Sequence, residues 1–450
     1  MPDLTPPLLA SLAILGVVWI IGLVRQGPAV AAGIVTLASL ALPRWVQADI
    51  VGAEIGLRTA AGVVSLGVMA VWPGYGIRTK LVWSDLLVAG LVIQTAVADA
   101  MNQTVPWMAG LRSYGEWAIP YLVGRYAVRD GADIRALAPW ALGVIGIVAA
   151  ATVLNFATGA NVYDRLFGEP PNSDFGRDVK RFGFVRATGP AEHPIFLAAI
   201  FLTLLPWAWA ATRDHRGSLK AVGWMAIAAV LAGVACGISR GPVVAAAVIA
   251  AVAVLFWLPV LKWPAILLAV GGAAAAAVYH QPIVDWASKT SDESKLATDV
   301  EIDGQRYESS NTRNRLLIWR LYAPEVNRRP LVGYGTAAVD NFPPAIPGLD
   351  ENERTMYLLR YVDNTYLYLA IRMGWIGTAL IAGLLLTSIV IAARLAPDRS
   401  LLGFPAAAAS TLAGLAVLLA TVYLSYNFAF EVLLLCGAVS GLRAGPPNHF

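Results

Sequence analysis

Residues 361–393 read YVDNTYLYLAIRMGWIGTALIAGLLLTSIVIAA, a short polar start followed by a long apolar run. About 20 apolar residues cross a hydrocarbon core of roughly 30 Å as a helix, so 364–393 predicts a membrane span. The polar start closes a hydrophilic segment, 281–363, that interrupts an otherwise membrane-like chain. An ordered polar segment of this size beside a hydrocarbon edge favours an enzyme that works at the membrane surface.

Composition places the whole chain in the membrane class. Hydrophobic residues make up 58% and charged residues 14% of the 450, against roughly 25% charged in soluble domains, and the mean hydropathy is +0.63. We predict an all-α polytopic membrane protein, one membrane domain over 1–450 with about 12 or 13 transmembrane helices. The expected spans are 7–24, 28–43, 58–73, 84–100, 107–127, 134–156, 192–212, 220–238, 241–260, 263–280, 364–393, 401–422 and 425–442.

Basic residues in the short loops predict the orientation. The two long loops, 157–191 and 281–363, fall in the opposite set of loops and should face outward. A net charge of +4 then suits anionic membrane lipids on the cytoplasmic side and predicts no nucleic-acid partner. The basic residues expected in the cytoplasm are Arg25, Arg78, Lys80, Arg125, Arg129, Arg135, Arg213, Arg216, Lys220, Lys262, Arg394, Arg399 and Arg443.

The end of the first long loop carries a candidate site. Pro194 suits the first turn of a helix, which places His193 at the helix cap and Arg186 just outside the membrane. One interpretation is a capped helix beside a solvated arginine. The other is an anion site, because the free backbone donors and the positive dipole end of a helix N-terminus favour phosphate.

A second candidate is Ser239-Arg240-Gly241-Pro242, between two spans on the same outer face. Positive charge there goes against the positive-inside tendency. Arg240 either extends to lipid headgroups or binds a diphosphate, for which a guanidinium offers a bidentate fork.

In the second long loop, 311–327 predicts an amphipathic helix that lies along the membrane interface. Its polar side should carry Arg313 and Arg320, seven residues apart. Its apolar side should hold Leu317, Trp319, Leu321 and Tyr322. The acidic stretch 299–304 predicts a short hairpin and not a calcium loop, because Ser310 stands where a bidentate acid is required.

Some ionisable residues fall inside predicted spans. Arg112 and Glu116, four residues apart, are expected to share a helix face and pair, as a structural contact or a substrate contact. Arg372 should either extend to the interface or point into a cavity. With no zinc-type spacing and only four histidines, we expect no metal and no cofactor.

In their order along the chain, these segments resemble the O-antigen ligase and polysaccharide polymerase superfamily of bacterial membrane glycosyltransferases, over about 160–380. One position departs from the pattern, because ligases of this family usually carry histidine where this chain has Asp363. The matching motifs are 186–189 with His193-Pro194, Ser239-Arg240-Gly241, the helix 313–319 with Pro330 and 333–335, and Asp363-Asn364-x-x-Leu367 with 373–377.

The resemblance implies a class C glycosyltransferase fold and transfer of a glycan from an undecaprenyl diphosphate carrier to a glycan or lipid-linked acceptor hydroxyl. The reaction would take place on the periplasmic side of the bacterial inner membrane, without metal or nucleotide, and in-line displacement would invert the anomeric centre. The diphosphate would be bound by Arg240, Arg186, Arg313 and Arg320.

For the base that takes the acceptor proton, Asp363, beside Asn364, is the first candidate and His193 the second. The alternative role for Asp363 is a helix cap. Aspartate in place of the ligase histidine favours a polymerase. The competing class is a transporter or flippase of lipid-linked sugars, for which paired halves and helices interrupted near the midplane are typical.

Overall fold

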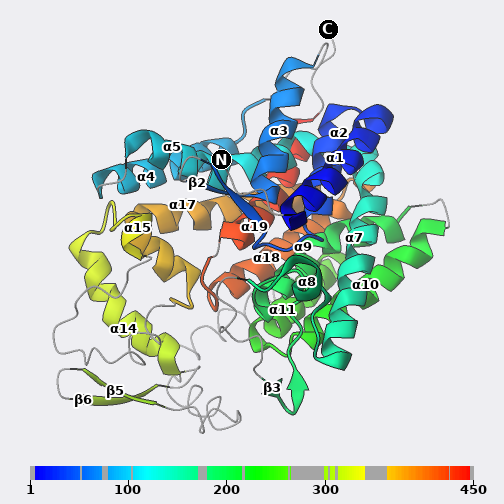
Figure 1. The fold of residues 1–450 in the computed structure, drawn as a ribbon. Coiled ribbons are helices and arrows are strands. Elements are labelled where there is room, and N and C mark those ends of the chain that lie inside the picture. Colours follow the sequence, from blue (N-terminus) through cyan, green and yellow to red (C-terminus); the bar gives the residue numbers. More distant parts are fainter. Residues whose placement is uncertain are drawn as a thin grey trace.

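The protein is described from a computed structural model covering residues 6–50, 53–72, 80–102, 105–170, 180–214, 218–261, 264, 298–302, 305–309, 313–339, 362–424 and 426–445. Helices dominate these residues (Figure 1). In the first half they are α1 Pro6–Gln26, α2 Pro28–Ser39, α3 Leu57–Val71, α4 Trp83–Met101, α5 Pro106–Ser113, the π-helix η1 Tyr114–Ala118, α6 Ile119–Ala127, α7 Gly131–Thr158 and α8 Val162–Phe167. The remainder are α9 Pro194–Thr212, α10 Ser218–Cys236, α11 Arg240–Trp257, η2 Pro259–Leu261, α14 Arg313–Arg328, α15 Thr336–Val339, α17 Thr365–Leu395, η4 Arg399–Leu401, α18 Phe404–Leu419 and α19 Tyr426–Ala444.

Strands form only small antiparallel hairpins in the described residues. They are β1 Gln47–Ile50 with β2 Ala53–Gly56, β3 Lys180–Arg181 with β4 Phe184–Val185, and β5 Thr298–Ile302 with β6 Gln305–Ser309. In the last hairpin Thr298 pairs with Ser309 and Ile302 with Gln305. The hairpin predicted from the acidic stretch is thereby confirmed.

The prediction of an all-α polytopic membrane protein is confirmed. Within the described ranges, 7 helices are long and apolar enough to cross a membrane, and α2, α3 and α18 are shorter apolar helices. Each predicted span matches a helix or a run of consecutive helices, except 263–280, of which the structure describes only residue 264. The apolar spacing alone was sufficient because a helix that satisfies its own backbone is one of the few structures that hydrocarbon tolerates.

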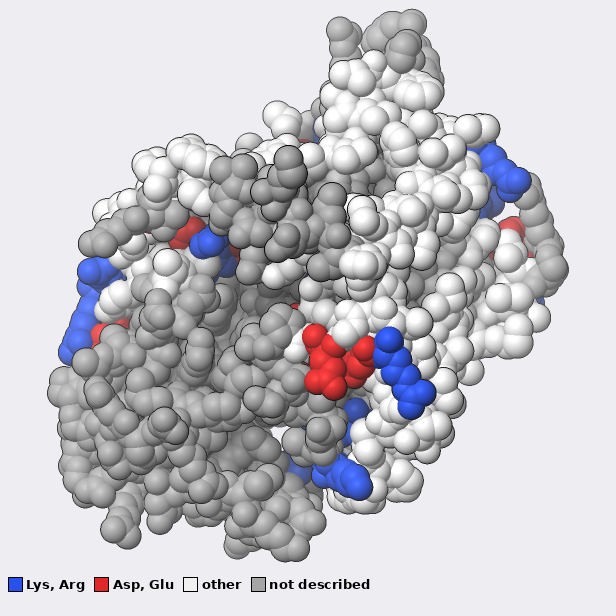
Figure 2. Space-filling model, in the orientation of Figure 1, with Lys and Arg blue, Asp and Glu red and all other residues white. Residues whose placement is uncertain are grey.

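Helix α9 is the centre of the bundle. In the most apolar 18-residue stretch of α9, 89% of the residues are buried, against 22% in the corresponding stretch of the peripheral α1. Helix α9 packs on α7, α10, α11, α18 and α19. On α1 the large apolar side chains Ile14, Val17 and Ile20 are more than half exposed. Figure 2 shows the surface over α1 and α7 as almost free of charge, as expected of a surface that faces lipid.

Close packing of α6 on α19 depends on glycine. A Cβ at Gly124 would clash with the carbonyl oxygen of Leu434, and one at Gly437 with that of Tyr121. Small residues let two helix backbones approach inside a membrane, where dispersion contacts supply much of the attraction.

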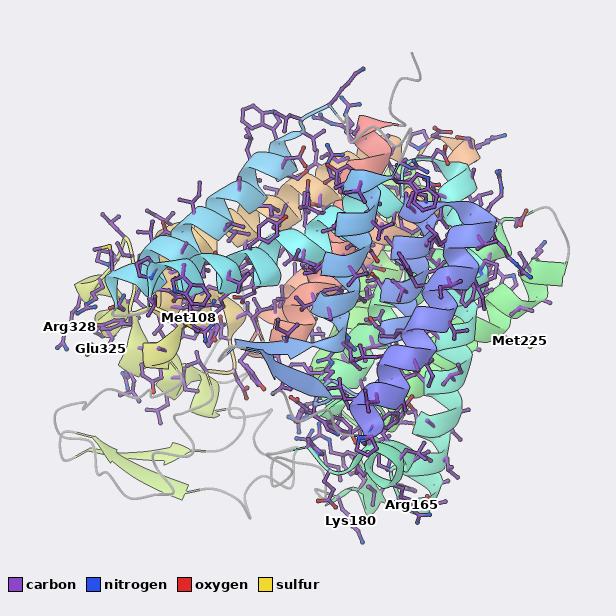
Figure 3. The ribbon with its side chains drawn as sticks, turned by 45° about the horizontal axis from the view of Figure 1, so that its top comes forward. Met108, Arg165, Lys180, Met225, Glu325 and Arg328 are labelled. Carbon is purple, nitrogen blue, oxygen red and sulfur yellow. The ribbon has the colours of Figure 1, made fainter. Side chains whose placement is uncertain are left out.

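The bundle has two ends, which α7 connects. The first residue of α7, Gly131, packs so closely on Ser400 that a Cβ there would overlap the Ser400 carbonyl oxygen; we call this the inner end. Near the last turn of α7, Asn155 Oδ1 accepts a hydrogen bond of 2.9 Å from Thr188 N; we call this the outer end. Arg125 and Lys80, both predicted to be cytoplasmic, lie at the inner end, where Arg125 donates to Lys80 O at 2.7 Å. Figure 3 shows Arg165 and Lys180 at the same end of the molecule, the outer end.

Candidate functional site

Two arginines of the first long loop meet the turn between α10 and α11. Arg186 is 5% exposed, and its Nε donates to Gly237 O at 3.2 Å. Arg181 Nη1 donates to the next carbonyl, Ile238 O, at 3.3 Å. Burial, and secondarily the charge of Arg181, lower the pKa of Arg186 to about 10. The guanidinium remains charged at neutral pH, so an anion bound here would relieve the repulsion between the two arginines.

His193 is the N-cap of α9, as predicted. Its Nδ1 accepts a 3.2 Å hydrogen bond from Ile195 N, so the proton of the neutral ring belongs on Nε2. Burial, then the charges of Arg186 and Arg181, lower the pKa of His193 to about 3. The ring is therefore neutral near pH 7, and with so low a pKa it is a weak base.

Arg240 is the first residue of α11, directly after the turn that Arg186 and Arg181 bind. The N-cap Ser239 is buried, whereas Arg240 is exposed. A Cβ at Gly241 would lie 2.8 Å from Thr421 Oγ1, so the start of α11 packs closely on the turn that follows α18. The first residue of α11 is thus an arginine, at the positive end of the helix dipole.

Asn364, and not Asp363, caps α17. Its Oδ1 accepts from Leu367 N at 3.0 Å and its Nδ2 donates to Ala420 O at 3.0 Å. The prediction that Asp363 could serve as the cap is wrong, because the helix begins at Thr365 and the cap is the residue before it. Asp363 precedes the cap and is partly buried. Both polar ends of the Asn364 side chain have structural partners.

Three helix N-termini therefore meet around two turns, 237–241 and 420–422. The turn 237–241 lies beside the start of α9, since a Cβ at Gly237 would be 3.3 Å from Pro194 O. The same turn also packs on Thr421 through Gly241. The turn around Thr421 binds the start of α17, through Asn364 and through a hydrogen bond of 2.7 Å from Thr365 Oγ1 to Val422 O. We call this arrangement the outer-end cluster. The backbone segments that carry Arg186, His193, Arg240, Asp363 and Asn364 all belong to it.

The predicted diphosphate residues Arg313 and Arg320 belong to α14, which packs on α17. Leu317, Ile318 and Tyr322 of α14 pack on Leu367 and Ile371 of the first half of α17, in a cluster that includes Val362. Arg320 is exposed, and the side chain of Arg313, the first residue of α14, lies outside the described residues.

Part of the predicted apolar side of α14 is wrong. Leu317, Ile318 and Tyr322 are buried and form the apolar side of α14. Trp319 lies on the opposite side of the helix and is 37% exposed, and Ile318 occupies the core instead.

A comparison with protein families bears on this region. Residues 225–382 match the family model described as O-Antigen ligase. Over this segment the chain is similar to the O-antigen ligase family. The resemblance seen in the sequence is thus confirmed over α10 to the first part of α17, which includes Arg240, Asp363 and Asn364 but neither Arg186 nor His193. The match supports a ligase or polymerase type of activity. A search of curated proteins gives no match.

The O-antigen ligase segment also contains a broken helix. Gly374 in α17 has φ 71° and ψ 179°, which only glycine adopts readily, and the backbone groups around the break bond to the loop 330–335. Tyr334 N donates to Ile371 O at 2.8 Å, Gly335 N to Arg372 O at 2.9 Å, and Trp375 N to Pro330 O at 2.8 Å. The predicted motifs 333–335 and 373–377 are thus two sides of one junction that attaches α14 and α15 to α17.

Arg372 lies at this junction and is paired. Its Nη1 and Nη2 donate to the two carboxylate oxygens of Glu116 at 2.6 and 2.5 Å, and its Nε donates to Thr336 Oγ1 at 2.7 Å. The predicted pairing of Glu116 with Arg112 is wrong: Glu116 lies in the π-helix η1, whose wider turn rotates it away from the exposed Arg112. Arg372 is neither at the interface nor in an open cavity, because Glu116 and Thr336 enclose it.

Sequence reasoning missed a buried ionic network beneath the outer-end cluster. Glu431 of α19 bonds both Arg44 and Arg58, with Arg58 Nη1 at 2.9 Å from its Oε1, and all three residues are less than 5% exposed. Arg44 also lies over the ring of Phe196 and donates to Phe196 O at 3.3 Å. Since its N donates to Pro190 O at 3.2 Å, Arg44 supports the segment that carries His193. A lone glutamate inside an apolar span was the available signal.

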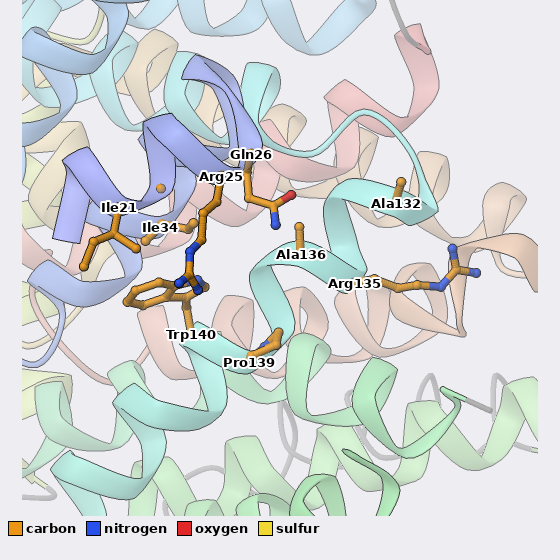
Figure 4. Close-up of a pocket in the computed structure, with 10 residues that line it drawn as sticks. Ile21, Arg25, Gln26, Ile34, Ala132, Arg135, Ala136, Pro139 and Trp140 are labelled. Carbon is orange, nitrogen blue, oxygen red and sulfur yellow. The ribbon is translucent and has the colours of Figure 1, made fainter. Parts of the chain in front are cut away.

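The described residues contain no group of three or more His, Cys, Asp or Glu side chains that could hold a metal ion. A pocket of about 410 Å³ lies at the inner end, between α1 and the start of α7 (Figure 4). Figure 4 shows the side chain of Arg25 extending to the ring of Trp140. None of the predicted site residues lines this pocket.

Proposed function

We propose that the protein is a membrane glycosyltransferase of the O-antigen ligase or polymerase type. It transfers a glycan from an undecaprenyl diphosphate carrier to an acceptor hydroxyl at the outer-end cluster. The observation that carries the proposal is the meeting of three helix N-termini with Arg186, Arg181 and Arg240 around the turns 237–241 and 420–422. Backbone donors, positive dipole ends and guanidinium forks all favour a diphosphate.

The charge at this cluster suits the departing group. As the bond between the anomeric carbon and the diphosphate oxygen breaks, the electron pair stays on the diphosphate, which gains negative charge. Preorganised guanidinium and backbone N–H groups stabilise that charge without reorganisation during the reaction. Arg240 and Arg186 are the groups we assign to this role, with Arg313 and Arg320 of α14 as further candidates.

Asp363 takes the acceptor proton in this proposal. The acceptor hydroxyl attacks the anomeric carbon opposite the leaving diphosphate, its proton passes to the Asp363 carboxylate, and the configuration inverts. His193 is the weaker candidate because its Nδ1 caps α9 and its pKa is about 3. Its Nε2–H is suited to donate to a diphosphate oxygen. Asn364 holds the start of α17, and so positions Asp363.

The finer assignments belong to the same proposal. The outer-end cluster faces the periplasm from the bacterial inner membrane, the donor needs no metal or nucleotide, and aspartate at 363 favours a second carrier-linked glycan as acceptor, which makes the enzyme a polymerase. The competing transporter would use interrupted helices as binding sites. The break at Gly374 does not serve that purpose, since the loop 330–335 occupies its backbone groups.

The test is glycan transfer by purified protein in detergent, given lipid-linked oligosaccharide and chelator. Arg240→Ala and Asp363→Ala should each lower the rate by about 10²-fold or more, whereas Arg165→Ala, an exposed arginine at the same end, should transfer at the parental rate. Transfer at the parental rate by folded Arg240→Ala and Asp363→Ala would remove the site assignment. An inactive parent that moves lipid-linked sugar across proteoliposomes would support the transporter.

A further inference from the structure

A large groove opens at the inner end of the bundle, far from the outer-end cluster. Its volume is about 1060 Å³, and it lies between the last turns of α9, α11 and α17, beside η4 and the start of α18. Helix α9 has 19 residues and is therefore about 28 Å long. Since His193 caps the start of α9, the groove is about one hydrocarbon thickness from the cluster and at the opposite membrane interface.

The mouth of the groove is positively charged. Arg213 lies over two indole rings, 5.1 Å from the centroid of Trp209 and 5.0 Å from that of Trp257. Arg399 is an exposed second guanidinium in the lining. The carboxylate of Asp398 accepts from Ser400 N at 2.9 Å and from Ser400 Oγ at 2.6 Å, which caps η4. Two positive charges against one engaged carboxylate leave a net attraction for an anion.

The depth of the groove is apolar. Val252, Leu255 and Phe256 of α11 line it, opposite Ala393 of α17 and Ala406 of α18. The alanines make room between three helices, while Trp209 and Trp257 mark the depth at which aromatic side chains meet headgroups. The apolar depth suits an acyl chain, and the aromatic and cationic mouth suits a phosphate headgroup, so the groove matches a phospholipid.

We propose that this groove binds one anionic diacyl phospholipid from the leaflet at the inner end. The phosphate lies between Arg213 and Arg399, and an acyl chain lies against Val252, Leu255 and Ala393. Basic pockets between transmembrane helices select anionic headgroups, and the indoles fix the Arg213 guanidinium in place. A zwitterionic lipid brings its own cation to the same mouth and is bound less tightly. The site is independent of the proposed glycan transfer, which takes place in the opposite leaflet.

The test is native mass spectrometry of the full-length protein, delipidated in neutral detergent and titrated with phosphatidylglycerol or phosphatidylcholine of the same acyl chains. We expect one bound phosphatidylglycerol, at least tenfold tighter than phosphatidylcholine. Arg213→Gln with Arg399→Gln should reduce that affinity at least tenfold. The matched control is Arg394→Gln, an exposed arginine on the last turn of α17 that does not line the groove, and it should retain the lipid.

A second variant, Ala393→Phe, fills the apolar depth and leaves both arginines in place, so it tests the groove even if the arginine variant does not fold. It should lower affinity for phosphatidylglycerol without changing the weak binding of inorganic phosphate. Equal affinity for the two lipids, full retention by Ala393→Phe, or inorganic phosphate that displaces the lipid at equal concentration would each overturn the proposal.

Discussion

Replacing Glu116 by Gln removes the counter-charge of a guanidinium that is enclosed in the protein. Arg372 is 3% and Glu116 5% exposed, and two hydrogen bonds of 2.6 and 2.5 Å join them. Breaking one partner of a buried pair costs roughly 3–5 kcal/mol, because the other charge is left without compensation. At roughly 2–4 °C per kcal/mol, Glu116→Gln should lower the melting temperature in detergent by about 10 °C.

The double variant Glu116→Gln with Arg372→Met separates lost charge balance from lost shape. Thr336 Oγ1 keeps its 3.0 Å hydrogen bond to Asp99 Oδ2 when Arg372 is gone. The neutral amide introduced at position 116 loses its partner, but a buried amide costs less to leave unpaired than a buried guanidinium, so the double variant should recover part of the loss. The control is Arg328→Gln, which removes the pair of Arg328, 65% exposed, with Glu325 (Figure 3) and should shift melting by less than about 2 °C. A single variant as stable as the parent, or a double variant no better than the single, would refute this reasoning.

Two further predictions concern the junction and the cap. Gly374→Ala should lower the melting temperature by more than Gly143→Ala, because a Cβ at 374 would lie 2.5 Å from Pro330 O at φ 71°, whereas one at 143 meets nothing; equal shifts by differential scanning fluorimetry would contradict this. The folded pKa of His193, about 3, lies below the ordinary value of 6.5, so the unfolded chain takes up the proton first and stability falls as the pH drops from 6.5 toward 3. Between pH 7 and pH 5 the parent should lose on the order of 1–2 kcal/mol more than His193→Asn, which keeps a capping acceptor; parallel melting curves for the two proteins would argue against a ring that folding keeps neutral.

The span pattern and the cap at His193 were predictable because both depend on local chemistry. Twenty apolar residues or a proline after a polar residue carry their meaning within a few positions. The order of Arg186, His193, Arg240 and Asp363 along the outer ends of spans also identified the residues that the fold brings together. Those ends must lie on one side of the membrane.

The pairing of Glu116 with Arg372 was not predictable because it depends on a π-helix and on a break in α17, neither of which has a clear spacing signal. The pairing of Glu431 with Arg44 and Arg58 was not predictable either, because Glu431 lies far from both arginines in the sequence. Local spacing favoured Arg112 as the partner of Glu116. Tertiary contacts decided otherwise.

The capping of α17 by Asn364 was missed for a smaller reason. Asp and Asn are nearly equal as caps, so the sequence could not choose between positions 363 and 364. The turn at Ala420, which accepts from the Asn364 amide, decides the position.

The most direct measurement for the central claim is the affinity of the purified protein for undecaprenyl diphosphate, the leaving product, without any acceptor. We expect Arg240→Gln to weaken this binding at least tenfold and Arg165→Gln, a change at an exposed residue of the same outer end, to leave it unchanged. Equal affinity of the parent and a folded Arg240→Gln protein would contradict a diphosphate site at the outer-end cluster.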